Sequence, residues 1–236
     1  MTNGSKPKDS AHDSSGLPDP QRLRGWAPSL TELQFESAQI YIRELSRFNK
    51  TLNLISPGTM PRVDAVHVLD SVRAWTLVAP RIPVGSLVYD LGSGNGLPGL
   101  LSAVMAPDRA FRLVDRDQRK LEFCKHVASA MGLKNVSTEC IDIDRLPASS
   151  INFALSRGFA SVTKALLMTR KLFAVGGSFF MLKGDSWTLE ISDLPPRLFG
   201  SWKVELVGKY ELPELSADFV VIECQRLAES GTSEKS

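Results

Sequence analysis

The sequence is poor in the residues that form cross-links or bind metals. Its 236 residues include three cysteines and three histidines. The cysteines Cys124, Cys140 and Cys224 are far apart and form no C-x-x-C pair. This pattern predicts buried free thiols in a reducing compartment, and it argues against disulfides or a zinc site. The histidines show no zinc-binding spacing either, so we expect no bound metal.

Long apolar runs and an excess of one charge are also missing. No stretch of about 20 apolar residues predicts a membrane span, and the N-terminal residues lack the apolar centre of a signal peptide. We therefore expect a cytoplasmic protein without a membrane partner. With 28 basic and 26 acidic residues the formal net charge is only +2, which neither requires nor excludes a nucleic-acid partner. The hydrophobic fraction of 43% indicates a globular chain.

The most informative segment is D-L-G-S-G-N-G-L-P-G at residues 90–99, which follows a short apolar run at 87–89. Glycine at alternate positions lets the backbone approach a bound ligand closely, because no Cβ stands in the way. A strand, a glycine-rich turn and an apolar helix in this order predict the nucleotide-binding turn of a Rossmann-type unit. We expect Gly92, Gly94 and Gly96 to lie at the ligand.

The acids around this turn distinguish between possible ligands. The spacing G-x-G-x-G differs from the G-x-G-x-x-G of dinucleotide-binding units, and Asp90 precedes the first glycine. Asp115 closes the next apolar run, where its carboxylate could accept hydrogen bonds from ribose hydroxyls, cap the following helix, or do both. Asp90 could hold the ammonium group of an amino-acid tail or fix the turn. These features favour S-adenosylmethionine over NAD.

Beyond residue 86, strand-like and helix-like segments alternate, which predicts an α/β fold with a mostly parallel sheet and helices on both faces. The last two strand-like segments have no helical pattern between them, so we expect a hairpin or a reversed final strand. The expected strands are 87–90, 111–115, 136–141, 153–156, 177–182, 201–210 and 217–225, and the expected helices are 98–105, 117–131 and 161–173.

The segments on either side of this core differ in composition. Residues 1–27 and 228–236 are polar, which predicts flexible tails. Residues 28–80 are expected to form an N-terminal helical extension that packs on a Rossmann-type nucleotide-binding core at 81–227. Its first helix would start at a capping box of Ser29 and Glu32, and a second helix would cover about 60–79.

Further candidate site residues follow the later strands. Ile143 and Asp144 could contact an adenine, or form an ordinary loop. Arg157 could grip a phosphate or the cofactor carboxylate with its planar fork, or form a surface ion pair. Phe159 could stack on a base or belong to the core. Lys183 could contact a phosphate or be solvated.

Two other features have simpler readings. His67 is expected to be a packed or capping residue more than a catalyst. The basic residues of the helix after Asp115 are expected to coat its exposed face; they are Arg116, Arg119, Lys120 and Lys125.

Four segments together resemble one family. They are F-N-K-T-L-N-L at 48–54, H-V-L-D-S at 67–71, the glycine-rich segment at 90–99, and L-S-R-G-F-A at 155–160 followed by L-K-G at 182–184. On these motifs the chain resembles the RsmG family (also called GidB), the guanine-N7 methyltransferases of small-subunit ribosomal RNA. Phe48, Asn95 and Gly158 depart mildly from the family pattern, which bears on the acceptor more than on the cofactor.

The resemblance implies a Rossmann-like class I methyltransferase with a seven-stranded, mostly parallel sheet. It implies S-adenosylmethionine as cofactor and 16S ribosomal RNA or the 30S subunit as partner, and we expect a monomer. The cofactor contacts implied or expected are Asp90, Gly92, Gly94, Gly96, Leu97, Asp115, Ile143, Asp144 and Arg157. Arg157 and Lys183 are expected to position the acceptor or the cofactor without exchanging protons.

Three alternatives remain open at this point. The first is a methyltransferase that acts on another RNA, a small molecule or a protein, for which a closed apolar acceptor pocket would be expected in the small-molecule case. The second is an NAD(P)-dependent oxidoreductase, which would need a different glycine spacing. The third is a non-catalytic cofactor-binding factor in ribosome assembly.

Overall fold

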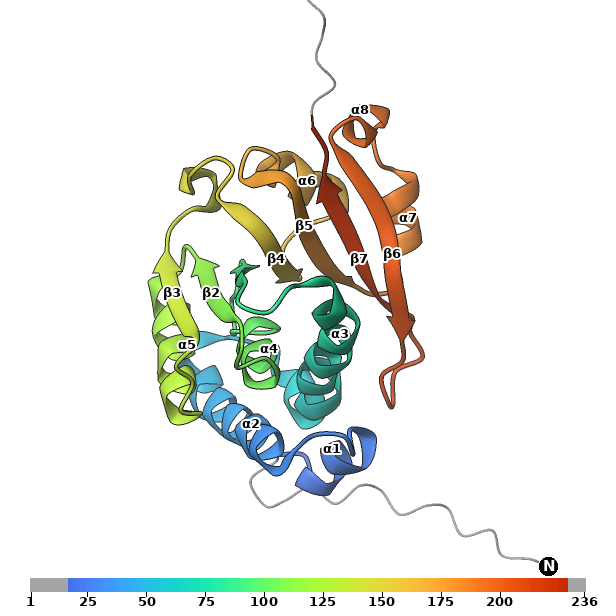
Figure 1. Cartoon of the computed structure of the whole chain (residues 1–236). Helices are drawn as coiled ribbons and strands as arrows, with labels where there is room; N and C mark the ends of the chain where they lie inside the picture. The colour runs from blue at the N-terminus through green and yellow to red at the C-terminus, as the bar shows by residue number, and fades with distance from the viewer. Residues whose placement is uncertain (1–16, 229–236) are drawn as a thin grey trace, which may run out of the picture.

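Seven strands form one sheet in the order β3-β2-β1-β4-β5-β7-β6, with helices on both faces (Figure 1). The structure is a computed structural model that describes residues 17–228, and the outer parts of the two expected tails lie outside the described residues. The strands are β1 (Leu87–Leu91), β2 (Ala110–Asp115), β3 (Val136–Cys140), β4 (Ile151–Arg157), β5 (Phe173–Lys183), β6 (Trp202–Tyr210) and β7 (Phe219–Arg226).

The first five strands are parallel, and the direction in which successive strands are added reverses between β1 and β4. Ligands of open α/β sheets bind beyond the carboxyl ends of the strands at such a switch point. Asp90 of β1 lies beside Leu155 of β4 in the register, so the glycine-rich turn and the residues after β4 meet at this point. The predicted parallel sheet is confirmed.

Of the last two strands, only β7 runs against the others. β7 pairs antiparallel with β5 on one side and with β6 on the other, so β6 forms the edge of the sheet. The expected reversal at this end is confirmed. The sequence reading missed two short helices before β6, which are α7 (Trp187–Ser192) and α8 (Pro196–Phe199).

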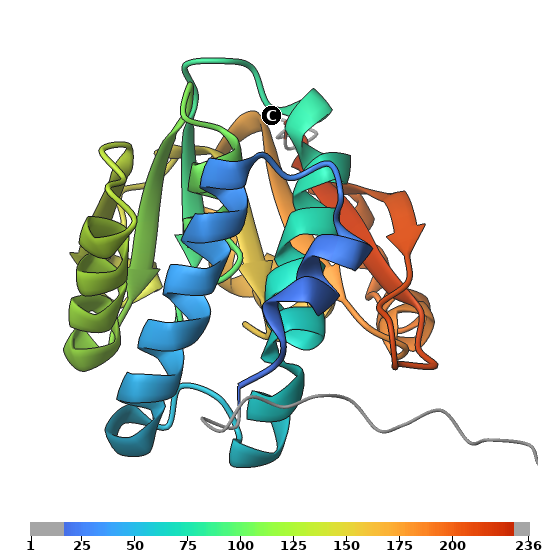
Figure 2. The same cartoon turned by 90° about the horizontal axis from the view of Figure 1, so that it is seen from below.

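The helices form a separate core on each face of the sheet. One face carries α3 to α5, with α2 and α1 packed outside them, and the other face carries α6 to α8 (Figures 1 and 2). β1 supplies both cores, because Val88 points into one and Tyr89 and Leu91 point into the other. The remaining helices are α1 (Pro20–Trp26), α2 (Glu32–Leu52), α3 (Asp70–Val78), α4 (Gly99–Met105), α5 (Gln118–Ala130) and α6 (Val162–Thr169).

The N-terminal tail was predicted too long. Residues 20–26 form α1, in which Pro20 occupies the first turn and Asp19 caps the helix by accepting a hydrogen bond from the Gln21 amide at 2.9 Å. Leu23 is fully buried in the same core as α2 to α5. The buried leucine, the capped turn and the ion pair of Arg22 with Asp64, 3.2 Å long, together order a segment whose composition is polar.

The first predicted capping residue was also wrong. α2 begins at Glu32, so Thr31 is its N-cap, and Thr31 forms a capping box with Gln34. The Gln34 amide donates to the Thr31 hydroxyl at 3.3 Å, and the Thr31 amide donates to Gln34 Oε1 at 3.0 Å. The middle of α2 contacts the site, since the hydroxyl of Tyr41 donates to the carbonyl of Asn95 in the glycine-rich segment.

We expect Thr31→Ala to lower the free energy of unfolding by about 1 kcal/mol, because the helix loses the acceptor for its first free amides. Urea denaturation measures the change. Ser29→Ala is the matched control, since it removes the same hydroxyl at the position that the sequence reading had chosen. Equal losses for both variants would contradict this assignment of the cap.

The second predicted helix, at about 60–79, is regular only in its C-terminal half. Pro57 and Pro61 lack backbone N–H groups, and the chain forms a short 3₁₀ segment there (Pro57–Arg62). A single π-helical turn (Asp64–Leu69) then leads into α3. π turns occur often at functional sites, and this one carries His67 and directly precedes Asp70.

The cysteines are free, as predicted, but they are not all buried. Cys124 and Cys224 are buried, whereas Cys140 is exposed at the end of β3 near the edge of the sheet. Within residues 17–228 no helix has both the length and the apolar character required to cross a membrane.

Candidate functional site

Two adjoining cavities lie at the carboxyl ends of the parallel strands. The larger has a volume of about 590 Å³ and the smaller about 470 Å³. Both fall within the size range of small-molecule sites. They share four lining residues, which are Gly92, Asp115, Lys120 and Gly158. The site therefore lies at the switch point between β1 and β4.

Asp90 holds the glycine-rich segment in place through a hydrogen bond to its last residue. Its Oδ2 accepts a hydrogen bond from the Gly99 amide at 2.8 Å, while Oδ1 is buried without a partner. Burial raises the pKa of Asp90 to about 7. Asp90 is not among the described residues that line either cavity. Of the two roles considered for it, the structure supports fixing the turn.

Gly92 lines both cavities, and no other residue type fits at this position without strain. It has a φ of +69°, and a Cβ at this position would meet the ring of Phe159 at 2.7 Å. Gly94 also lines the larger cavity, but Gly96 does not: a Cβ there would meet Leu100 at 2.4 Å. Gly96 therefore permits close packing of the turn on α4, which is a structural role.

Asp115 connects the turn to the end of β2. Its Oδ2 accepts from the Gly94 amide at 2.8 Å, and its Oδ1 accepts from the Asp117 amide at 2.9 Å. Each carboxylate oxygen can accept a further hydrogen bond. Because Asp115 also lines both cavities, it can hold the turn and a ligand hydroxyl at the same time.

Part of the lining of the smaller cavity is apolar and suits a flat ring. Ile143, which was predicted to contact the cofactor, lines it. Asp144 is exposed and does not line it, whereas Asp142 does. The apolar lining residues are Ile141, Ile143, Phe159, Ala160 and Met168.

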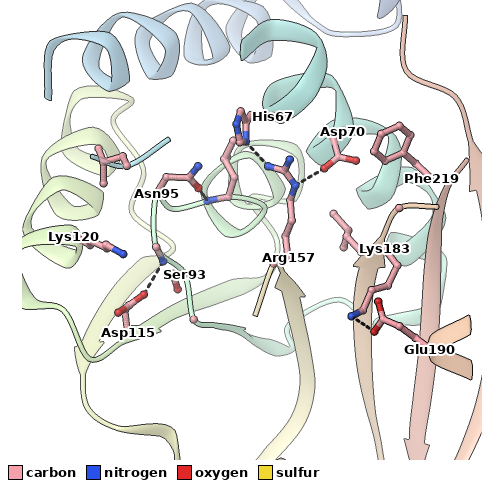
Figure 3. Close-up of a pocket in the computed structure, with 17 residues that line it drawn as sticks. His67, Asp70, Ser93, Asn95, Asp115, Lys120, Arg157, Lys183, Glu190 and Phe219 are labelled. Carbon is pink, nitrogen blue, oxygen red and sulfur yellow. Dashed lines mark hydrogen bonds and ion pairs between the residues drawn. The ribbon is translucent and has the colours of Figure 1, made fainter. Parts of the chain in front are cut away.

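Arg157 is already paired within the chain (Figure 3). Its Nε lies 2.7 Å from Asp70 Oδ2, and its Nη2 donates to the Val66 carbonyl at 2.8 Å. Its Nη1 contacts Nδ1 of His67. The sequence analysis considered a phosphate, the cofactor carboxylate or an ion pair for Arg157, and within the chain its anionic partner is Asp70. Arg157 nevertheless lines the larger cavity, beside Leu97 and Gly158.

Asp70 joins the N-terminal helices to the far end of the sheet. Besides Arg157, it contacts Tyr210, whose hydroxyl donates to Asp70 Oδ1 at 2.6 Å. Burial raises the pKa of Asp70, although Arg157 and the Tyr210 hydroxyl oppose the shift. α3, β4 and β6 are thus connected through one buried carboxylate.

His67 is neutral in this arrangement. Burial, followed by the neighbouring Arg157 guanidinium, lowers the pKa of His67 to about 3. Since Arg157 donates to Nδ1, the imidazole carries its proton on Nε2. His67 lines the larger cavity as a neutral group, so this packed residue also forms part of the wall of the site.

We expect His67→Gln to make the protein less sensitive to acid. Between its ordinary pKa of 6.5 and about 3, His67 takes up a proton in the unfolded chain but not in the folded one, so stability falls with falling pH. A glutamine can still accept from Arg157 and does not titrate. Asp90, with its raised pKa, acts in the opposite direction in both proteins and cancels in the comparison.

Urea unfolding between pH 6.5 and 4.5 measures this difference. The stability of the wild type should fall relative to that of the variant as the pH decreases. Parallel curves for the two proteins would show that His67 is not shielded as described.

Lys183 is also paired. Its Nζ lies 2.7 Å from Glu190 Oε2 and donates to the Ala160 carbonyl at 2.7 Å. Burial opposes ionisation of Glu190, but hydrogen bonds from Lys183 and the Val162 amide hold its pKa below the usual value. Both side chains line the larger cavity, where Phe219 from β7 joins them (Figure 3).

Lys120 is the cation that the sequence reading placed wrongly. It was expected on the exposed face of α5, yet it is half-buried and lines both cavities. It forms no ion pair with a carboxylate of residues 17–228. Asp70, Glu190 and Phe219 were not singled out as site residues either, and only Asp70 belonged to a quoted motif.

Comparison with known proteins agrees with this geometry. The family model described as rRNA small subunit methyltransferase G matches residues 34–209. Among the curated relatives, ribosomal RNA small subunit methyltransferase G 3 of Bdellovibrio bacteriovorus is 39% identical over 207 residues, which are 88% of this chain and 94% of the relative. Ribosomal RNA small subunit methyltransferase G of Laribacter hongkongensis is 32% identical over 179 residues, which cover 75% and 82%.

Solved structures support the fold. The YcgJ protein of Bacillus subtilis has a TM-score of 0.52 at 12% identity and covers 69% of this chain and 100% of its own. A SAM-dependent methyltransferase from Aquifex aeolicus has a TM-score of 0.50 at 15% identity, with 72% and 99% covered. The predicted fold class is thereby confirmed, and the family model with its relatives identifies this chain as a member of the rRNA small subunit methyltransferase G family.

Proposed function

We propose that this protein transfers the methyl group of S-adenosylmethionine to N7 of a guanine in 16S ribosomal RNA. The observation that carries the proposal is the pair of cavities around Gly92 and Asp115 in a chain of this family. Three basic residues, Lys120, Arg157 and Lys183, line the larger cavity. Asp70, Asp115 and Glu190 line it as well, so the lining is charged and polar and suits a nucleotide of RNA better than an apolar small molecule.

The cofactor fits the residues that are present. Gly92 has no Cβ to clash with the ring of Phe159, Asp115 offers carboxylate oxygens for ribose hydroxyls, and Ile143 lies in the partly apolar cavity suited to adenine. When bound, S-adenosylmethionine supplies an activated methyl group on a sulfonium. Cofactor contacts at Leu97, Arg157 and Asp144 remain proposals from the resemblance, with Asp144 the least supported because it lies away from the cavity.

The chain needs no general base for this reaction. Guanine N7 carries a lone pair in the plane of the ring and no proton, so attack on the methyl group releases none. The bond from sulfur to the methyl carbon breaks as the bond from N7 forms, and the positive charge moves from sulfur to the base. The residues of the site therefore bind, orient and desolvate the reactants, which can supply several kcal/mol of acceleration.

The pairing of the basic residues agrees with this requirement. His67 is neutral with Nδ1 occupied, and Arg157 and Lys183 each contact a carboxylate. These groups are held in place and are not free to exchange protons, so we assign Arg157 and Lys183 a positioning role. The carboxylate of Glu190 lines the larger cavity and could stabilise the cationic product.

Two experiments test the proposal. The thermal midpoint should rise with S-adenosylhomocysteine and remain unchanged with NAD, because only the first matches this turn. Purified protein with methyl-labelled S-adenosylmethionine should then label 16S RNA from cells that lack the gene, and leave 23S RNA unlabelled. Stabilisation by NAD alone would support the oxidoreductase alternative. Cofactor binding without transfer to any RNA would support the assembly factor.

Other aspects of the proposal follow from the acceptor. An enzyme of ribosomal RNA is expected in the cytoplasm, and we propose that it acts there as a monomer without a metal ion. Either free 16S RNA or the 30S subunit could present the guanine. The division into an N-terminal extension and a core at 81–227 also belongs to the proposal, and the ion pair of Asp70 with Arg157 joins these two parts.

A further inference from the structure

We propose that the Lys183–Glu190 pair selects guanine as the acceptor base, with Lys183 donating to O6 and Glu190 accepting from N1–H. This inference rests on the proposed function and adds the residues that recognise the base. It concerns the side of the larger cavity that lies away from Asp115 and Lys120 (Figure 3).

The two side chains are held together and face the same space. Lys183 ends β5 and Glu190 lies on the short helix α7, and both line the larger cavity. Their charged atoms are 2.7 Å apart, with 12% of the Lys183 side chain and 19% of the Glu190 side chain exposed. A fixed pair that is largely removed from solvent can discriminate between ligands in a way that mobile surface charges cannot.

Each partner retains unused hydrogen-bonding capacity. The Lys183 ammonium has three N–H donors, of which two are used by Ala160 and Glu190. Glu190 Oε2 accepts from Lys183 and from the Val162 amide, while Oε1 accepts only from the Ser186 hydroxyl at 3.2 Å. Because its lowered pKa keeps Glu190 ionised, it can only accept. The pair thus offers one donor beside one acceptor.

That pattern is complementary to one edge of guanine. O6 accepts and the adjacent N1–H donates, so Lys183 and Glu190 can each form a hydrogen bond with it. Adenine presents the reverse, a donating amino group beside an accepting N1. It would place donor against donor and acceptor against acceptor, and the unpaired polar groups would weaken binding.

Phe219 completes the recognition site. It lines the same cavity, and on β7 it is held by Tyr210, whose ring centroid lies 6.0 Å away at an interplanar angle of 25°. Unstacked bases of RNA stack on aromatic side chains, and we expect the acceptor base to stack on Phe219. Since O6 neighbours N7 on the purine, fixing O6 and N1 also determines where N7 points. The pair therefore contributes to both selection and orientation.

Base analogues test the inference directly. The wild-type enzyme first identifies the modified guanine, and a 16S RNA fragment is then prepared with guanine, inosine or 2-aminopurine at that position. Inosine keeps O6 and N1–H but lacks the 2-amino group, whereas 2-aminopurine keeps the amino group but lacks O6 and N1–H. We expect kcat/KM for inosine within about threefold of guanine, and for 2-aminopurine at least about 10-fold lower.

The variant Glu190→Gln separates recognition from a structural role. It should lower kcat/KM about 10-fold or more for guanine and inosine, and change the value for 2-aminopurine little. The matched control is Glu122→Gln, which removes an ion pair of Glu122 with Lys125, 2.8 Å long, from the exposed surface of α5. This control should leave kcat/KM unchanged for all three substrates.

Two outcomes would overturn the inference while leaving the proposed function intact. In one, the wild type methylates 2-aminopurine as well as guanine. In the other, Glu190→Gln lowers kcat/KM for all three substrates by the same factor, as expected of a merely structural residue. A wild type that methylates no guanine in 16S RNA would refute the proposed function and this inference together.

Discussion

Replacing Arg157 by alanine is expected to lower the free energy of unfolding by about 3 kcal/mol, because removing one partner of a buried ion pair leaves the other charge uncompensated. Asp70 is buried, and without Arg157 its carboxylate would keep only the Tyr210 hydroxyl as a polar partner within residues 17–228. Urea denaturation measures the loss.

The same variant should also lose methyl transfer. Arg157 lines the larger cavity and holds the turn that carries His67, so its removal displaces two walls of the site. Small misplacements of reacting groups cost about 100-fold in rate, and we expect a fall of that order at saturating cofactor and RNA. Labelled transfer under conditions where the variant is folded measures it.

A second substitution separates the two effects. In Arg157→Ala with Asp70→Asn, the carboxylate that lost its partner becomes a neutral amide, which can still accept from Tyr210. This double variant should regain at least half of the lost stability and remain poor in transfer. An Arg157→Ala protein that unfolds at the wild-type urea concentration, or that turns over at the wild-type rate, would contradict the account of this ion pair.

Replacing Asp115 by alanine is expected to weaken the binding of S-adenosylhomocysteine at least about 100-fold. Two charge-assisted hydrogen bonds contribute roughly 3 kcal/mol, and each 1.4 kcal/mol corresponds to a tenfold change in affinity. The variant would lose the proposed contact with the ribose, and the Gly94 amide would lose its acceptor in the turn. Isothermal titration calorimetry gives the dissociation constant.

Asp117 provides the control for this prediction. It is the N-cap of α5, where its carboxylate accepts from the Arg119 amide at 3.0 Å, and it lines neither cavity. Asp117→Ala should cost about 1 kcal/mol of stability and leave the affinity unchanged. If both alanine variants bind S-adenosylhomocysteine as the wild type does, Asp115 is not a cofactor ligand.

The sequence predicted those parts of the fold that depend on local pattern. The apolar run before Asp90, the glycines after it and the alternation of strands and helices are local signals, and the structure contains the corresponding strands, turn and sheet. Local pattern did not predict where α1 and α2 begin, because contacts distant in sequence or the exact start of a helix determine this. Leu23 orders α1 through burial against distant helices, and Thr31 displaces Ser29 as the cap because of where the helix actually begins.

The site was predicted in part for the same reason. Asp115 and Ile143 follow predicted strands, so their place at the sheet edge could be inferred. The partners of the basic residues could not, because Asp70 lies 87 residues before Arg157 and Glu190 lies on a helix of six residues that gives no periodic signal. Lys120 shares a helix with exposed lysines and arginines, and only the packing of α5 shows that it borders the cavities.

The most direct test of the central claim is the chemical position of the transferred methyl group. Ribosomal RNA from cells that lack the gene is incubated with the wild-type protein and methyl-labelled S-adenosylmethionine, digested to nucleosides and analysed by mass spectrometry. The account predicts 7-methylguanosine from 16S RNA as the labelled product. Label on a ribose oxygen, on an adenine or on a guanine atom other than N7 would contradict it.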